Sequence, residues 1–464
     1  MNPHVEEPRS WAETHFRSAQ LGDARRTERL VRTATELARQ PEGSLPEHFL
    51  LAPLRAVYRL CNRSEVTHQA VTAPHFAETA KALRASRDPV LILHDLTELN
   101  YTSHHALQGL GPTGNGYGRG LHQHNSLAVD ANTGRVIGLT SQIVLQPVAA
   151  PQGETRSARN HRQRLSQLWE RGIRALGPAP EGVLWVDVAD RDADNFEAMQ
   201  AARELGHHFL FRGYHDRKVF VGDGPGDAPR RLPSWARSLP ARASKEVVIR
   251  EQGGRPERTA RVRMAGAAAW FPVPAARRRE HPDWGPIRVW VERIWEPRPP
   301  ADVAEPLEWI LVSSLSAEDE EALSRHCDWY ARRPLIEVFH QVEKTGCGEE
   351  DLRFQTTAAL APMLGVLAVV AVRVLQLRWW CREGGDARAS AASTAEERSA
   401  LKGLGERVVT ARDFVRAVAK LGGFLGRPGD GEPGWQTLWR GYRRLQDIIL
   451  GMRLKTGRVR LEPG

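Results

Sequence analysis

Hydrophobic residues between positions 89 and 212 occur in short runs that alternate with longer amphipathic segments. Runs typical of strands cover 89–95, 182–190 and 207–212, and two more strands flank an Asn-Thr-Gly turn within 124–145. Helical spacing covers 155–175 and 192–206. The pattern therefore predicts the order strand, hairpin, helix, strand, helix, strand.

The segments on either side have different patterns. Residues 1–85 have helical spacing, whereas 213–308 alternates short strand-type runs with loops rich in Gly, Pro and Arg. The apolar run 358–372 contains Pro362 and predicts a buried helix, because it is short for a membrane span. Residues 384–400 are small and polar, which predicts a linker or mobile loop, and helical spacing returns after it.

Together these elements predict an α/β protein with a ribonuclease-H-like core. The core is expected at 86–212 and 309–383, interrupted by a β-rich insertion at 213–308. A helical domain is expected before it at 1–85 and another after it at 384–464. The length of 464 residues agrees with several structural units.

Composition adds a partner and a compartment to this picture. The 65 Lys and Arg residues exceed the 56 acidic residues, and the net charge of +9 indicates a polyanionic partner such as nucleic acid. The four cysteines have no disulfide or metal-ligand spacing, and the first residues contain no signal-type segment, so we expect a cytoplasmic protein. Five arginines of the first domain fit either a phosphate-facing side or a solvated helix face: Arg25, Arg26, Arg29, Arg32 and Arg59.

Polar side chains recur in the half-apolar stretch YARRPLIEVFHQVEKTG, residues 330–346. At about 100° per residue, four of them share one stripe of a helix, opposite an apolar face: Tyr330, Arg333, Glu337 and Lys344. Pro334 disfavours helical geometry at the residue before it, so we expect the helix to start or kink there and only Glu337 and Lys344 to share one regular helix. The stripe fits either a solvated helix face or one side of a site whose other residues lie elsewhere.

Two of the predicted strands end in an aspartate, Asp95 and Asp190. If these strands are parallel neighbours, both side chains lie at the carboxyl edge of the sheet, although each fits the alternative role of a turn cap. Glu337, on a helix packed over that edge, would complete a cluster of three carboxylates. Such a cluster needs hard cations, and two Mg²⁺ or Mn²⁺ ions in it support cleavage and joining of phosphodiesters.

The spacing of Tyr330, Arg333, Glu337 and Lys344 resembles the motif of the insertion-sequence-four family of bacterial DDE transposases. Further segments are similar to this family and occur in its order: LGDARRTERLV, HDLTELNYTSH, GLGPTGNGYGRGLHQHNSLAVD, VADRDADNFE, PLEWILVSSL, FHQVEKTG and the closing LGGFLG. The resemblance covers nearly the whole chain, and the combination of segments is specific.

The resemblance implies a cut-and-paste DNA transposase that cleaves at transposon ends, forms a hairpin and joins the ends to target DNA. It implies that Asp95, Asp190 and Glu337 are the catalytic acids and hold two Mg²⁺ or Mn²⁺ ions per active site. Residues 1–85 would bind double-stranded transposon ends, and 384–464 would form a homodimer on DNA. The implied DNA-contacting residues are Tyr330, Arg333, Lys344, Arg212, Trp309, Arg25, Arg26, Arg29 and Arg59.

Some features depart from the family or fit two interpretations. Pro334 and Leu335 stand where relatives often have Trp and Arg, so one DNA contact is expected to be missing. Trp309 fits a base-stacking residue or a core tryptophan. The aromatic residues of the last domain fit an interface or a small core: Trp435, Trp439 and Tyr442. The alternative functions are a metal-dependent nuclease without joining activity and an inactive DNA-binding regulator.

Overall fold

Helices form the amino-terminal part of the computed structural model, as the pattern predicts. The structure describes residues 6–39, 43–114, 116–149, 151, 153–155, 164–222, 228–249, 258–301, 303, 305–382, 384–427 and 430–455. The first helices are α1 (Pro8–Phe16), α2 (Ala24–Arg39), α3 (Leu45–His48), α4 (Leu51–Cys61) and α5 (His68–Arg84). In α2, Leu30, Ala34 and Leu37 are buried at helical spacing, and α1, α4 and α12 pack around that helix.

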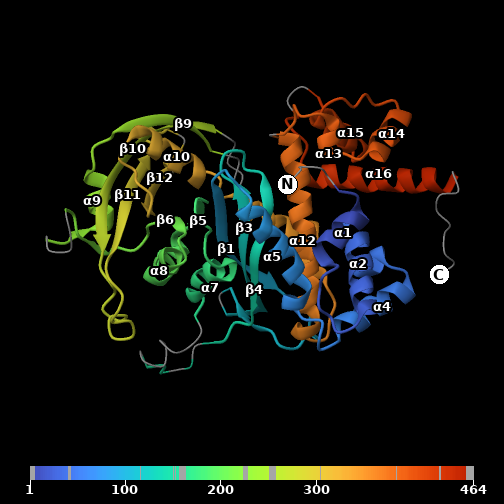
Figure 1. Ribbon diagram of the computed structural model, residues 1–464, viewed down its shortest axis with the longest axis horizontal. Coiled ribbons are helices and arrows are strands. Elements are labelled where there is room, and N and C mark those ends of the chain that lie inside the picture. Colours follow the sequence, from blue (N-terminus) through green and yellow to red (C-terminus); the bar gives the residue numbers. More distant parts are fainter. Residues whose placement is uncertain are drawn as a thin grey trace.

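A mixed sheet of ten strands crosses the middle of the molecule (Figure 1). Its first strands are β1 (Val90–Asn100), β2 (Gly111–Thr113), β3 (Gly118–Asp130), β4 (Val136–Leu145), β5 (Trp185–Ala189) and β6 (His208–Arg212). β1 pairs antiparallel with β3 and parallel with β5, which in turn pairs parallel with β6. β2 and β4 pair with the other edge of β3. This order fits a ribonuclease-H-like core and confirms the predicted α/β class.

Helices cover both faces of this part of the sheet. On one face lie α7 (Gln167–Leu176), the short 3-10 helix η1 (Arg191–Ala193) and α8 (Phe196–Glu204), with α7 packed on β3 and β4 and α8 on β6. On the other face, α5 and α12 pack against β4. The helix predicted at 155–175 is present from Gln167, and residues 156–163 lie outside the described ranges.

The segment predicted as a β-rich insertion extends the same sheet. It contains β7 (Lys218–Val219), β8 (Arg230–Arg231), α9 (Leu232–Ser238), β9 (Ala243–Ile249), β10 (Arg258–Phe271) and β11 (Ile287–Trp295). β12 (Glu308–Ser313) pairs antiparallel with β6, and β11, β10 and β9 follow outward (Figure 1). β12 therefore covers the edge of β6 that would otherwise leave backbone groups unpaired, and the strands of the insertion extend the sheet beyond β12.

After β12 the chain returns over the core. It forms α10 (Glu320–Tyr330), α11 (Leu335–Gln341), the π-helical turn η2 (Val342–Gly346), the 3-10 helix η3 (Glu349–Asp351) and α12 (Thr357–Arg382). Residues Thr357–Trp380 are long and apolar enough to cross a membrane, but 89% of their most apolar window is buried inside the molecule. The prediction of a buried core helix in this region is confirmed, since α12 packs against α2, α5, β4 and α15.

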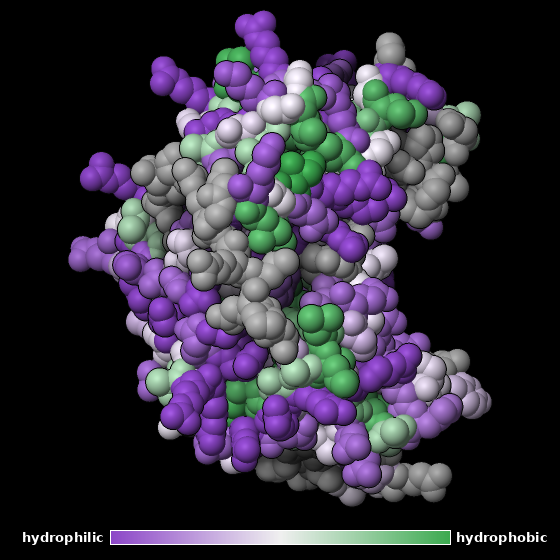
Figure 2. All heavy atoms as spheres, turned by 90° about the vertical axis from the view of Figure 1, so that its right-hand side faces the viewer, coloured by the Kyte–Doolittle hydropathy of each residue, from purple (hydrophilic) through white to green (hydrophobic). Residues whose placement is uncertain are grey.

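Four helices form the carboxy-terminal part: α13 (Ala389–Ala392), α14 (Ala395–Gly403), α15 (Ala411–Leu421) and α16 (Trp435–Lys455). The prediction of a linker or mobile loop at 384–400 is wrong, because this segment contains α13 and most of α14. Thr394 and Glu397 form a capping box that starts α14, and some small residues of the segment are buried, Ala392 and Ala400 among them. The face seen in Figure 2 is mostly hydrophilic, with separate hydrophobic patches.

Candidate active site

The structure brings together the three acids that the sequence predicts as a cluster. Asp95 lies within β1, Asp190 follows the end of β5, and Glu337 lies in the first turn of α11, which packs on β1. Side chains alternate between the two faces of a strand. Asp95 therefore shares the face of Leu93, and Asp190 shares the face of Val188, in the same hydrophobic cluster as Phe339 of α11.

One guanidinium group lies at the centre of the cluster. Arg333 Nη2 is 2.8 Å from Asp95 Oδ1 and 3.2 Å from Asp190 Oδ2, and Arg333 Nη1 contacts Glu337 Oε1. The other oxygen of Asp190, Oδ1, accepts a hydrogen bond from the backbone N–H of Asp192 at 3.0 Å. Both interpretations of this aspartate are therefore correct, since the same side chain caps a turn and joins the cluster.

The cluster is partly shielded from solvent, and this changes its proton equilibria. Burial raises the pKa of Asp95 to about 7; Arg333 opposes this rise, and the like charges of Asp190 and Glu337 add to it. His340 Nδ1 lies 3.7 Å from Asp95 Oδ2. Burial, together with the charges of Lys344 and Arg333, lowers the pKa of His340 to about 3. His340 is therefore neutral at physiological pH, and Arg333 supplies the cationic charge at this point.

The predicted single stripe of polar residues is spread over several elements. Tyr330 ends α10, Arg333 lies in the turn after it, and α11 begins directly after Pro334, as the proline predicts. Lys344 lies in η2, whose wider turn breaks the helical spacing, so the expectation that Glu337 and Lys344 share one regular helix is wrong. Lys344 Nζ instead donates to the carbonyl oxygen of Glu98, near the end of β1.

Tyr330 belongs to a small group of residues that were predicted to bind DNA. Its ring meets Trp309 edge to face, with 5.0 Å between the ring centroids. Burial raises the pKa of Tyr330 to about 12, and the neighbouring charges of Arg212 and Arg333 oppose this rise. Trp309 is half-buried on β12 and packs against the main hydrophobic cluster. A group of four side chains therefore adjoins the acids on the side of β6 and β12: Tyr330, Trp309, Arg212 and Arg333.

A second charged group, missed by the sequence interpretation, lies on the opposite face of the same strands. Asp187 Oδ1 is 2.9 Å from His94 Nε2, and Asp187 Oδ2 is 3.0 Å from His207 Nδ1. Ser126 Oγ is 2.9 Å from the other ring nitrogen of His94. Strand alternation could have predicted this group. Asp187 and Asp190 are an odd number of residues apart, so their side chains lie on opposite faces of the sheet.

A second buried acid also escaped the sequence interpretation. Glu343, the residue before Lys344, is fully buried beneath the sheet and accepts hydrogen bonds from Gln123, Asn125 and Gln142. Burial raises its pKa, and the neighbouring Glu349 adds to the effect. The π-helical turn places this carboxylate among the amides of β3 and β4, whereas a helical projection alone gives it no partner.

The three acids offer the hard oxygen ligands that Mg²⁺ and Mn²⁺ prefer. Within the described ranges, however, no group of three His, Cys, Asp or Glu side chains is spaced to hold one metal ion. The acids are too far apart to hold one ion because they are arranged around the Arg333 guanidinium. The donor chemistry fits a divalent cation, whereas the present spacing fits a guanidinium.

The amino-terminal arginines lie on two helices. Arg25, Arg26 and Arg29 are on α2, and Arg59 is near the end of α4. Arg26 is held by Glu65 at 2.9 Å, whereas Arg25, Arg29 and Arg59 have no ion pair with any part of the chain that the structure describes. Arg32, the other arginine of the predicted basic side, is 3.1 Å from Glu28. Three arginines therefore keep their charge available on the surface of the helical domain.

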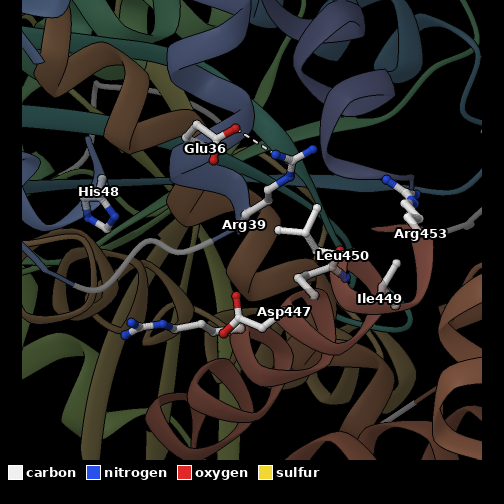
Figure 3. Close-up of a pocket in the computed structure, with 9 residues that line it drawn as sticks. Glu36, Arg39, His48, Asp447, Ile449, Leu450 and Arg453 are labelled. Atoms are coloured by element: carbon white, nitrogen blue, oxygen red, sulfur yellow. Dashed lines mark hydrogen bonds and ion pairs between the residues drawn. The ribbon is translucent and has the colours of Figure 1, made fainter. Parts of the chain in front are cut away.

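A pocket of about 130 Å³ lies where α2 meets α16 (Figure 3). Glu36 and Arg39 line it from α2 and are joined by an ion pair of 2.7 Å, and Asp447, Leu450 and Arg453 line it from α16. No residue of the acid cluster lines this pocket. Its position shows that the first and last helical parts of the chain contact each other.

The aromatic residues of the last part answer a question left open by the sequence. Trp439 and Tyr442 are buried, and the hydroxyl of Tyr442 donates to Glu397 at 2.7 Å. Both residues therefore belong to the core of the carboxy-terminal helices. The side chain of Trp435 lies outside the described part of the structure.

Two protein families match the helical parts on either side of this core. The transposase DNA-binding family matches residues 8–66, which contain α1 to α4. The Tn5 transposase dimerisation domain matches residues 394–459, which contain α14 to α16. The protein is therefore a transposase, a nucleic-acid-processing protein whose α/β core lies between a DNA-binding and a dimerisation region. More narrowly, it is a Tn5-like transposase of the insertion-sequence-four family, as the sequence resemblance indicates.

Proposed function

We propose that this transposase cleaves and joins DNA with Asp95, Asp190 and Glu337 as its catalytic acids. The observation that carries the proposal is their meeting on one face of the sheet, although 95 and 337 are far apart in the chain. The site lies at the carboxyl ends of parallel strands β1 and β5, where ligands bind in open α/β sheets. The basic and aromatic side chains beside it suit a nucleic acid substrate.

The residues around the acids have separate roles in this proposal. Tyr330, Arg333, Arg212 and Lys344 hold the DNA backbone near the acids through hydrogen bonds and charge. Trp309, already packed edge to face on Tyr330, receives an unstacked base. Asp95, Asp190 and Glu337 would hold two Mg²⁺ or Mn²⁺ ions, which would supply the charge neutralisation and hydroxyl activation that phosphodiester chemistry needs.

The order of reactions rests on the family resemblance. Water cleaves one strand and frees a 3′ hydroxyl at the transposon end. This hydroxyl attacks a phosphodiester of the opposite strand, which forms a hairpin and releases the flanking DNA with a 3′ hydroxyl. The hairpin is reopened, and the 3′ ends then attack target DNA. Two copies act together on two DNA ends, each cutting the end bound mainly by the other, with the carboxy-terminal helices providing the protein contacts.

The test uses the full chain and DNA that carries the terminal repeat flanking its coding region. Glu337→Gln keeps the size of the side chain but removes its charge, so we expect Mg²⁺-dependent cleavage to be abolished while binding to the end DNA stays mostly intact. The matched control is Glu98→Gln on β1, whose carboxylate accepts from the Gly114 N–H at 2.9 Å, away from the acids.

Three other outcomes contradict the proposal in different ways. Cleavage that survives in Glu337→Gln removes this residue from the catalytic group. Cleavage of supercoiled DNA without joined products identifies a nuclease. A wild-type protein that binds ends but never cleaves is a regulator of transposition.

A further inference from the structure

Arg333 is the cation that the three acids share in the DNA-free protein. Its guanidinium contacts a carboxylate from each of three chain segments, and its side chain is only 11% exposed. Its Nε is buried and has no hydrogen-bond partner within the described structure. The three acids therefore hold the head group, and its Nε adds no hydrogen bond to these contacts.

A guanidinium and a metal ion cannot occupy the centre of this cluster together. Mg²⁺ requires its oxygen ligands at about 2.0–2.1 Å in a near-octahedral arrangement. The nearest oxygens of Asp95 and Asp190 instead lie 2.8 and 3.2 Å from one nitrogen of Arg333, and Glu337 contacts the other nitrogen. For all three acids to reach one ion, the arginine head has to leave the space between them.

Other residues predicted to contact DNA lie beside the acids. Arg333 lies in the turn between α10 and α11, and its charge reaches the hydroxyl of Tyr330 as well as the acids. Arg212, on β6, acts on the same hydroxyl. A DNA backbone phosphate bound beside Arg212 would compete with the acids for the Arg333 guanidinium, which can bind a phosphate bidentately.

We propose that Arg333 is a built-in counter-ion that excludes divalent cations from the acids until a DNA phosphate draws it away. The proposal rests on the proposed function, because it takes these acids as the metal-binding group. DNA binding and metal loading are then linked: each cation enters as the arginine leaves, and the acids are never left without a positive charge. The reciprocal effect follows by linkage, so divalent ions strengthen DNA binding by the factor by which DNA strengthens metal binding.

The central test measures Mn²⁺ binding to the full chain without DNA, by titration calorimetry and by the rise in melting temperature. We expect weak binding to the wild type and binding at least about tenfold tighter to Arg333→Gln, because that variant frees the centre of the cluster. Arg332→Gln is the matched control for net charge, since Arg332 donates to the backbone of Ala131 at 3.0 Å on the β3–β4 turn. The control is expected to bind Mn²⁺ as the wild type does.

Two further variants keep the result interpretable. Arg333→Lys retains a positive charge but lacks the fork that reaches three acids, so it should fold and bind Mn²⁺ with intermediate affinity. Arg333→Gln combined with Glu337→Gln should lose the gain, which assigns the Mn²⁺ to this cluster.

The outcomes separate this proposal from the proposed function. If Arg333→Lys and Arg333→Gln bind Mn²⁺ no more tightly than the wild type, the counter-ion role is refuted, even where cleavage still depends on Glu337. Tight Mn²⁺ binding to the DNA-free wild type, lost in Glu337→Gln, likewise refutes it while supporting the acids as a metal site. Tighter binding in both Arg333 variants, abolished by Glu337→Gln, supports it.

Discussion

Replacing Asp187 with asparagine should destabilise the core without touching the acid cluster. Asp187 lies on the opposite face of β5 from Asp190, is fully buried, and links His94 of β1 with His207, which precedes β6. Asparagine keeps the shape of the side chain but has no charge to offer the two imidazoles. The change therefore tests the charge of the group, with little disturbance of its packing.

The magnitude follows from two estimates. Burial tends to raise the pKa of Asp187, but the charge and hydrogen bond of His207 and the bond from His94 outweigh burial and lower it to about 2. Relative to the ordinary value of 3.8, this corresponds to about 2 kcal/mol of stabilisation at neutral pH. Hydrogen bonds to charged groups contribute about 1.5–3 kcal/mol each. The two figures together predict a loss of about 2–6 kcal/mol for Asp187→Asn.

The loss should depend on pH in a defined direction. The lowered pKa of Asp187 makes its contribution complete above about 4 and lost as pH falls towards about 2. The pKa of His207 is raised above 6.5: burial lowers it, but the charge and hydrogen bond of Asp187 outweigh burial. Its contribution is present below 6.5 and is lost as pH rises through the raised value. The destabilisation should therefore be largest between about pH 4 and 6.5.

The assay is calorimetric or fluorescence-monitored unfolding of wild type and variant from pH 5 to pH 9. Asp95→Asn is the matched control, because it removes the same charge from the neighbouring strand on the other face. In that position three carboxylates share one guanidinium, so the control should be as stable as the wild type or more stable. Equal stability of Asp187→Asn and wild type across this range would refute the reasoning.

Two further predictions concern other parts of the chain. Burial raises the pKa of Glu349 to about 8, with Lys344 opposing the rise and Glu350 adding to it, so this residue costs the wild type stability as pH rises from about 4.5 to 8. Glu349→Gln should remove this loss and unfold at a higher temperature than the wild type at pH 9. In α16, a Cβ on Gly441 would lie 1.7 Å from the carbonyl oxygen of Val418 in α15, whereas one on Gly451 meets no atom within 4 Å. Gly441→Ala should therefore cost about 1–3 kcal/mol or more and weaken self-association in sedimentation, while Gly451→Ala should be neutral or slightly stabilising.

The element order of the core was predictable because its signals are local. Short apolar runs bounded by Asp and Gly mark β1, β5 and β6, and the Asn-Thr-Gly turn marks the hairpin of β3 and β4. The joining of the insertion to the sheet was not predictable in this way, since β12 pairs with β6 through contacts about 100 residues apart in sequence. The helices within 384–400 were missed because small, polar residues signal a loop, whereas Thr394 and Glu397 start a helix there.

The acid cluster was predictable only in part, for a similar reason. Strand ends and the spacing of the motif point to Asp95, Asp190 and Glu337, but a helical projection cannot foresee that α10 ends at Tyr330 and leaves Arg333 in a turn. That turn is what lets one arginine reach acids on both strands as well as the glutamate four residues later. The sequence interpretation assigned Arg333 to DNA alone, because the competing partners become apparent only when the strands are paired.

Aspartates on the two faces of β1 and β5 have different roles: one stabilises the fold, and the others form the acid cluster. Asp187 is sealed among two histidines with no exposed surface, so its partners are permanent and its charge contributes to stability. Asp95, Asp190 and Glu337 lie at the edge, with side chains 14%, 24% and 39% exposed, and one arginine contacts all three. Three carboxylates facing one guanidinium attract a further cation, and a single side chain can rotate away where a buried network cannot. Asp187 and Asp190 are only three residues apart but lie on opposite faces of the sheet. The face that each aspartate occupies therefore decides whether its ion pair is structural or exchangeable.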